Sequence, residues 1–177
     1  METGKISNRY ARAIFEYAAQ KGEENILQNE LKTLAAHFFD LPELKRVSED
    51  PTVDKSKKIN ILQAAAGNSI SQSCKDMLKL IVNNDRADYV YSIALMYDKI
   101  YRKEKKILLT CLSSVKPIDD KTKQALVNLI VKDNEKVEFL TQIDESLIGG
   151  FVLSIEDRRL DASVRNQLNE IKKELLQ

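Results

Sequence analysis

The sequence is poor in the residues that most often carry out chemistry. It contains one histidine, His37, two cysteines and no tryptophan among 177 residues. A Ser-His-Asp or Cys-His catalytic set would have to be built around His37 alone. This histidine precedes two phenylalanines in a stretch with helical periodicity, so we expect it to be packed or partly exposed. The sequence therefore predicts a protein that is not an enzyme.

Cysteine and glycine are too scarce to build a metal or phosphate site. Cys74 and Cys111 form neither a CxxC motif nor a metal-ligand pattern, and we expect two buried thiols in a reducing cytosol. Gly149 and Gly150 are adjacent, but a phosphate loop needs further glycines and usually a Lys-Ser or Lys-Thr pair. We expect no cofactor and no metal. The glycine pair instead predicts a positive-φ turn or a close backbone approach at the start of a strand.

The chain also lacks an excess of charge of either sign and a long apolar run. It has 28 basic and 27 acidic residues, so its net charge of +1 gives no field that would attract nucleic acid. The basic run at 102–106 is expected to close a helix and to lie in a solvated linker. No stretch approaches the ~20 apolar residues of a membrane span. We expect membrane association only through a partner, and the acidic, arginine-free N-terminus favours a bacterial protein over one with a transit peptide.

What the sequence does contain, from Ile6 to about Glu104, is helical periodicity. Glycine, proline and asparagine interrupt the periodicity at Gly22, before and after the third helix, at Gly67-Asn68 as a left-handed cap, and at Asn84-Asp85 as a turn. This pattern predicts an all-α six-helix bundle. The expected helices run from Ile6 to Gly22, over 23–39, 41–47, 53–66 and 69–83, and through Val90 and Tyr101 to about Glu104.

Near Lys105 the period changes from helix to strand. Residues 107–112 form an apolar run of strand length, and Asp119-Asp120 opens a helix through Leu126, Leu129 and Ile130. A second strand alternates at Val137, Phe139, Thr141 and Ile143, and a third at Phe151, Leu153 and Ile155. We expect a turn at Asp157-Arg158, a short return from Leu160, and a last helix opened by Asp161 or Ser163 with an apolar stripe of Val164, Leu168, Ile171 and Leu175.

The order strand-helix-strand-strand-helix after a helical bundle predicts two domains. We place the all-α domain at 1–104 and the small α+β domain at 105–177.

The segment around the glycine pair resembles the signature of the delta subunit of F-type ATP synthases, the family of the oligomycin-sensitivity-conferring protein. The matching positions are Asp144, Ser146 to Phe151, Asp161, Ser163, Val164 and Leu168. Residues 8–18 are similar to the family's opening helix, and 83–86 to its turn between the fifth and sixth helices. Glu156 stands where the family usually has glycine and Arg159 where it has an apolar residue, so we expect the hairpin to differ there.

The resemblance implies a non-catalytic stator subunit at the cytoplasmic face of the bacterial cell membrane. Its helical domain would bind the N-terminal helices of the alpha subunits, and its C-terminal domain would contact the b subunits of the peripheral stalk. Rotor torque would thereby be coupled to ATP synthesis and proton transport.

In the family, a groove between the first and fifth helices accepts the alpha helix. On the matching positions we expect partner-binding residues at Tyr10, Ala13, Ile14, Met77, Leu80 and Ile81, and structural signature residues at Ser146, Gly149, Gly150, Asp161 and Ser163. Small Ala11, Ala13 and Ala18 would let a partner backbone approach closely, and Leu80 and Val82 suggest a second apolar face on the fifth helix. The alternative, that these side chains are bundle core, stays open.

A small RNA-binding or regulatory adaptor is the competing hypothesis. It predicts exposed aromatic residues between basic residues on a strand face. The C-terminal domain offers only Phe139 and Phe151, both at alternating positions typical of a core, which disfavours a nucleic-acid partner.

Overall fold

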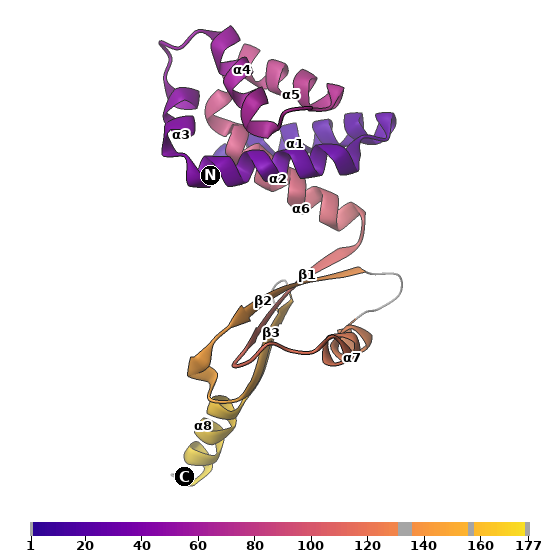
Figure 1. Cartoon of the computed structure of the whole chain (residues 1–177), viewed down its shortest axis with the longest axis vertical. Coiled ribbons are helices and arrows are strands. Elements are labelled where there is room, and N and C mark those ends of the chain that lie inside the picture. The colour runs from indigo at the N-terminus through magenta and orange to yellow at the C-terminus, as the bar shows by residue number, and fades with distance from the viewer. Residues whose placement is uncertain (1, 131–135, 156–157, 176–177) are drawn as a thin grey trace. The chain divides into compact units, whose positions relative to one another are not determined.

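The computed structural model describes residues 2–130, 136–155 and 158–175 (Figure 1). The chain divides into two compact units, Met1–Arg102 and Lys103–Gln177. The first is helical and the second combines a four-stranded sheet with helices. A helical N-terminal region followed by a small α+β module is therefore confirmed.

The helical unit follows the periodicity closely. The first helix begins earlier than predicted, at Glu2, and the third extends to Glu49. The turn expected at Asn84-Asp85 is present, with Asp85 at a φ of 56°. The helices of this unit are α1 (Glu2–Lys21), α2 (Glu24–Asp40), α3 (Pro42–Glu49), α4 (Lys55–Ala66), α5 (Gln72–Asn83) and α6 (Val90–Glu104), with a 3-10 turn η1 (Ala87–Tyr89) before α6.

Side-chain caps open α4 and α5, whereas α2 and α3 have no side-chain cap bond. Asp54 accepts a hydrogen bond from the backbone N–H of Ser56 at 3.1 Å and opens α4. The glycine cap predicted at Gly67 is present in part. Gly67 ends α4 with a positive φ of 145°, which favours glycine, but its ψ of 170° lies outside the left-handed helical region.

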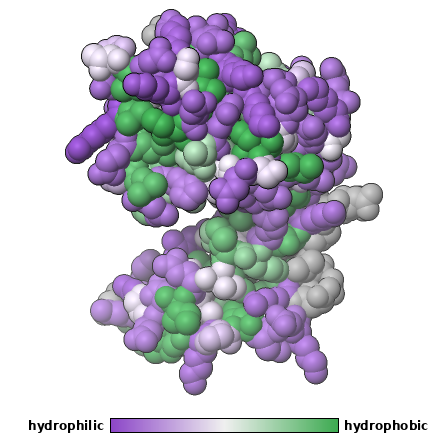
Figure 2. Space-filling view, turned by 45° about the horizontal axis from the view of Figure 1, so that its top comes forward, coloured by the Kyte–Doolittle hydropathy of each residue, from purple (hydrophilic) through white to green (hydrophobic). Residues whose placement is uncertain are grey.

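The core of the helical unit is built from the apolar stripes of its helices. Tyr97 is fully buried, packs against the ring of Phe15 with centroids 5.9 Å apart, and donates its hydroxyl to the carbonyl of Glu24 at 3.2 Å. Buried side chains of this size each contribute about 1.5–3 kcal/mol. Apolar side chains also reach the surface in patches separated by hydrophilic residues (Figure 2).

The sheet of the second unit has the order β2-β1-β3-β4. β1 pairs in parallel with β2, and α7 provides the crossover that a parallel pair requires. β3 pairs antiparallel with β1 and with β4. The elements are β1 (Ile107–Ser114), α7 (Asp120–Ile130), β2 (Lys136–Ile143), a 3-10 turn η2 (Glu145–Leu147), β3 (Gly150–Ile155), β4 (Arg158–Ser163) and α8 (Val164–Leu175).

The predicted element order missed one strand. The expected turn residue Arg158 and the short return from Leu160 are part of β4, which pairs with β3 from Gly150 opposite Ser163 to Ile155 opposite Arg158. Pairing with β3 gives this charged segment its extended form. Glu156 and Asp157 lie outside the described residues.

The apolar face predicted for the third strand is correct. Leu112, Leu126 and Leu153 form a buried cluster on one face of the sheet. Phe139, Phe151, Ile155 and Ile118 pack against it. The side chains of Leu129 and Ile130 lie outside the described residues. Across residues 2–130, 136–155 and 158–175, no helix is both long enough and apolar enough to cross a membrane.

Candidate functional site

An apolar groove lies on the helical unit between α1 and α5. It has a volume of about 340 Å³. Its floor is formed by Ile14 and Met77, which are nearly buried, while Leu80 on its wall keeps 50% of its surface exposed. The lining residues are Tyr10, Ala13, Ile14, Tyr17, Asp76, Met77 and Leu80. The structure thus brings together all of the predicted groove residues except Ile81.

Ile81 and two of the three small alanines do not line the groove and lie in the bundle core, the alternative left open above. Ile81, Ala11 and Ala18 are fully buried, so they pack inside the unit and present no surface to a partner. Ile81 follows Leu80 by one residue, a rotation of about 100° around a helix, and this rotation turns it to the core. Val82 is also buried, which leaves Leu80 as the exposed apolar residue of the second face of α5.

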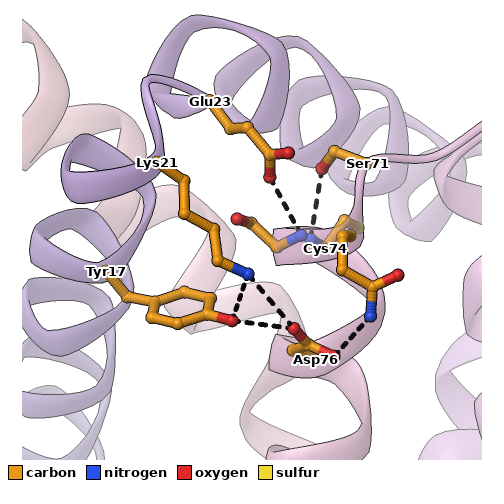
Figure 3. A network of polar contacts seen from close by, with 8 residues as sticks. Tyr17, Lys21, Glu23, Ser71, Cys74 and Asp76 are labelled. Atoms are coloured by element: carbon orange, nitrogen blue, oxygen red, sulfur yellow. Dashed lines mark hydrogen bonds and ion pairs between the residues drawn. The ribbon is translucent and has the colours of Figure 1, made fainter.

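Tyr17 and Asp76, which line one end of the groove, belong to a network of polar contacts (Figure 3). The Tyr17 hydroxyl donates a hydrogen bond to Oδ2 of Asp76 at 2.8 Å, and Gln72 donates to Oδ1 at 2.7 Å. Lys21 donates to the Tyr17 hydroxyl and forms an ion pair with Asp76 at 3.6 Å. Its ammonium also lies 4.2 Å from the centre of the Tyr17 ring. The Tyr17 hydrogen bond, followed by that of Gln72 and the charge of Lys21, lowers the pKa of the Asp76 carboxyl.

The N-terminus of α5 lies at the same end of the groove, and its backbone N–H groups are capped by Ser71, just before α5, and by Glu23, just before α2. Glu23 accepts from the N–H of Ser73 at 3.1 Å, and this bond lowers the pKa of Glu23 (Figure 3). Ser71 caps Cys74 at 3.2 Å, and Glu30 accepts both the N–H and the hydroxyl of Ser71, at 2.5 and 2.7 Å. These contacts fix the start of α5 against the start of α2 and hence the position of the groove wall.

The opposite end of the groove, at Tyr10, has fewer polar contacts. Asn84 donates a hydrogen bond to the hydroxyl of Tyr10 at 3.1 Å, and the guanidinium of Arg9 lies 6.0 Å from the centre of the Tyr10 ring. Sequence reasoning missed Tyr17 and Asp76 as lining residues, and Asn84 and Arg9 as contacts of Tyr10. The signal available was the stripe of Tyr10, Ile14 and Tyr17 along α1, which points to this face.

On the second unit, α8 presents the apolar stripe that the sequence predicted, and the stripe is exposed. Among the described residues its exposed fractions are 37% for Val164, which lies against Gly149, 54% for Leu168, 52% for Ile171 and 81% for Leu175. The helix is amphipathic, with Lys172 and Lys173 in its last turn.

The start of α8 is capped by two of the signature residues. Ser163 accepts a hydrogen bond from the N–H of Asn166 at 3.1 Å, which makes it the N-cap. Asp161 accepts from the N–H and the hydroxyl of Ser163 at 3.1 and 2.6 Å, and these bonds lower the pKa of Asp161. Asp144 likewise accepts the backbone N–H of Ser146 at 3.0 Å, before the glycine pair.

The glycine pair lies where β3 meets β4 and α8. Gly150 takes the positive φ expected of the pair, at 74°, and a Cβ there would lie 2.2 Å from the carbonyl oxygen of Ala162. A Cβ on Gly149 would lie 2.9 Å from Cγ2 of Val164, whose N–H bonds the Gly149 carbonyl at 3.0 Å. The preceding Ile148 also has a positive φ, 67°, and keeps 66% of its surface exposed.

His37 and the two cysteines are the remaining candidates for chemistry. Nδ1 of His37 lies 2.7 Å from the carbonyl oxygen of Ala65. Cys74 is buried, which raises its pKa to about 12, but Cys111 is exposed, so the prediction of two buried thiols is wrong for Cys111. It alternates with buried Thr110 and Leu112 and therefore points away from the covered face of β1.

Two chemical functions find no support in the part of the chain that the structure describes. No group of three or more His, Cys, Asp or Glu side chains there could hold a metal ion. Phe139 and Phe151 pack against the sheet core, as expected, and are not placed for stacking on bases.

Known proteins match this chain along nearly its whole length. The model of the family described as ATP synthase delta (OSCP) subunit matches residues 6–175. ATP synthase subunit delta of Azobacteroides pseudotrichonymphae is 45% identical, covering 97% of this chain and 98% of the relative. That of Bacteroides thetaiotaomicron is 38% identical, covering 99% and 96%. A chain from the Toxoplasma gondii mitochondrial ATP synthase hexamer has the same fold, with a TM-score of 0.67 at 22% identity, covering 97% of this chain and 98% of that one. The chain belongs to the ATP synthase delta (OSCP) subunit family.

Proposed function

We propose that this protein is a stator subunit that links the catalytic alpha/beta head of an ATP synthase to the b subunits of the peripheral stalk. The helical unit binds the N-terminal helix of an alpha subunit, and the sheet unit binds the b subunits. The subunit performs no chemistry and holds the head still while the rotor turns. It reaches the cytoplasmic face of the bacterial membrane only through the complex, and it couples torque to ATP synthesis and proton transport.

The groove between α1 and α5 is the observation that carries this proposal. An amphipathic helix buries its apolar stripe by lying in a groove of this kind. Ala13 leaves room for the helix, and Leu80 offers exposed apolar surface for it to cover. A grip that outlasts many turnovers needs nanomolar affinity, about 12 kcal/mol, which buried apolar contacts supply more readily than charges at the rim.

The exposed stripe of α8 supports the second half of the proposal. Its residues recur at the spacing that a partner helix contacts. We place the b subunit contact on this stripe.

Leu80→Asp tests the alpha site. We expect this variant to bind an alpha N-terminal peptide at least about tenfold more weakly, a change of about 1.4 kcal/mol, measured by isothermal titration calorimetry. Leu95→Asp is the matched control, because Leu95 is also half exposed, at 49%, but lies on α6 outside the groove. Circular dichroism and melting should match wild type for both. Equal loss of binding in the two variants, or none in either, would remove the groove from the proposal.

The b contact is tested in the same way on the other unit. Ile171→Asp should lose b in a pull-down from detergent-solubilised membranes while it retains alpha. Leu140→Asp is the control on β2, where the leucine is 55% exposed against 52% for Ile171. Normal recovery of b with Ile171→Asp would show that α8 is not the stalk contact. Failure of wild type to recover either subunit would refute the stator function.

A further inference from the structure

The two edges of the sheet differ in charge. The order β2-β1-β3-β4 gives β2 and β4 one neighbouring strand each, so both strands have an outer side at the edge of the sheet. β4 has charged side chains at Arg158, Arg159 and Asp161 among its six residues. Charged side chains on an edge strand hinder the addition of another strand. The edge at β4 is therefore protected.

The edge at β2 has less protection. Its charges lie in the first half of the strand, at Lys136 and Glu138. The second half, from Leu140 to Ile143, is uncharged and exposed at every position, with 55% of Leu140 and 59% of Ile143 accessible. An uncharged, exposed edge of this kind can bind a further strand through its backbone N–H and C=O groups.

The hydrogen bonds to β1 show which backbone groups of β2 face outward. The N–H of Lys136 bonds the carbonyl of Lys106, and the N–H of Asp144 bonds the carbonyl of Ser114, both at 2.9 Å. Even-numbered positions of β2 therefore direct their backbone groups toward β1, and the positions between them direct theirs to the open edge. The outward-facing residues are Val137, Phe139, Thr141 and Ile143.

This geometry restricts how β2 could pair with β2 of a second copy. Two identical surfaces related by a two-fold axis pair their strands antiparallel. Residues that face each other across an antiparallel pair are either both hydrogen-bonded or both not, so outward-facing residues must oppose one another. The centre of the pair then falls on a residue. Centres at Phe139 and at Leu140 pair the largest part of β2.

Charge distinguishes these two arrangements. With Leu140 at the centre, Lys136 of each copy lies opposite Asp144 of the other, and Glu138 lies opposite Gln142. The backbone of Asp144 is still extended, with φ −134° and ψ 98°, so it continues the line of the strand. With Phe139 at the centre, Lys136 would lie opposite Gln142 and would have no acidic partner. Opposite charges across a strand pair are stabilising.

We propose that β2 binds β2 of a second copy of this chain, antiparallel and centred on Leu140, so that the free subunit forms a reversible dimer. One sheet then continues through both copies. Because residues directly opposite each other share a face, Phe139 lies beside Thr141 of the second copy on the covered face, and the two Leu140 side chains meet on the other face. The inference goes beyond the proposed function and depends on neither the groove nor α8.

Sedimentation of the full chain tests the dimer. Between about 1 µM and 1 mM, the range of weak to moderate affinities, the wild-type mass should rise from monomer to dimer. Leu140→Lys should weaken the dimer at least about tenfold, because it places two like charges opposite each other. Leu160→Lys is the matched control on β4, where the leucine is 56% exposed, and it should dimerise as wild type does. A wild type that is monomeric at about 1 mM, or equal loss in both variants, would overturn the proposal.

Two substitutions at Gln142 test the charge pairing and do not depend on a loss of folding. Gln142→Lys should tighten the dimer by about 2- to 10-fold, because each new ammonium lies opposite Glu138 of the other copy. Gln142→Glu should weaken it by a similar factor, and added salt should reduce both effects. Equal effects of the two substitutions would contradict this arrangement of the strands.

Cysteine cross-linking tests the centre of the pair. The background is Cys111→Ser, since Cys111 is exposed on the strand next to β2 and pairs with Leu140. Under mild oxidation Leu140→Cys should form a disulfide between copies, because opposed residues that are not hydrogen-bonded bring their Cβ atoms to about 4.5 Å. Gln142→Cys should not, since it lies opposite Glu138. A disulfide through position 142 and none through 140 would overturn the proposal.

Discussion

The hydroxyl of Tyr17 and the carboxylate of Asp76 are joined by a 2.8 Å hydrogen bond between residues 59 positions apart in the sequence. The bond connects α1 to α5 and holds the Tyr17 ring at the end of the groove. Gln72 and Lys21 contact the same carboxylate, so the polar contacts at this end of the groove form without a bound partner.

Tyr17→Phe removes this bond and leaves the ring. We expect unfolding to become easier by about 1 kcal/mol or less, since the bond is exposed and water replaces it. The pKa of Asp76 should rise toward its usual value, because the Tyr17 hydrogen bond is the largest cause of its lowering. Carboxyl titration by NMR measures the pKa directly. An unchanged Asp76 pKa would mean that the bond does not form in solution.

The lowered pKa of Glu23 should make the free energy of unfolding depend on pH. Its pKa lies below the usual value of 4.5 because it accepts the N–H of Ser73, so the folded state binds the proton less tightly than the unfolded chain. Its stabilising effect is therefore complete above about pH 4.5 and is lost as the pH falls through the lowered pKa.

Glu23→Gln should thus melt at a lower temperature than wild type at pH 7, and the difference should vanish at low pH. Thermal melts across the acid range test this. A difference that stays constant with pH would show that the effect of the substitution is steric and not electrostatic.

The two signature glycines should differ in their tolerance of a side chain. Gly150→Ala should cost more than about 2 kcal/mol, because the new Cβ meets a backbone oxygen and φ is positive. Gly149→Ala should cost about 1 kcal/mol, because its clash is with a side-chain methyl. Denaturant unfolding measures both. In a Val164→Ala background the cost at Gly149 should fall while that at Gly150 persists; equal costs throughout would contradict the geometry.

The two thiols should differ in reactivity. Cys111 is exposed, whereas Cys74 is buried and its pKa is raised to about 12, chiefly by burial. An alkylating reagent at pH 8 should modify one thiol of the folded protein, at Cys111, and both after unfolding, as mass spectrometry can show. Rapid labelling of Cys74 in the folded protein would mean that α5 opens readily.

Helical periodicity and capping residues predicted the elements of the first unit well, because both signals are local. Strand β4 escaped prediction because Leu160 is a lone apolar residue between Arg159 and Asp161, and only pairing with β3 gives the segment its form. The exposure of Cys111 depends on which face of the sheet is covered, which the alternation along β1 does not reveal.

The groove was predicted from family resemblance, and its residues only in part from pattern. Leu80 and Ile81 are adjacent apolar residues, and periodicity alone does not say which of them faces the core. The polar end could not be foreseen, because the pairing of Tyr17 with Asp76 arises only when α1 and α5 pack in opposite directions.

The place of β1 in the sheet has a mechanical consequence. The strand starts shortly after α6 ends at Glu104, and it is hydrogen-bonded on both sides, in parallel to β2 and antiparallel to β3. A pull on the backbone at Ile107 that acts along β1, with the rest of the sheet held, loads these two ladders in shear. Bonds loaded in shear resist together, whereas bonds at an unzipping edge fail one after another. The sheet should therefore resist a pull at β1 more strongly than a pull that peels away β4, which in the sheet order pairs only with β3.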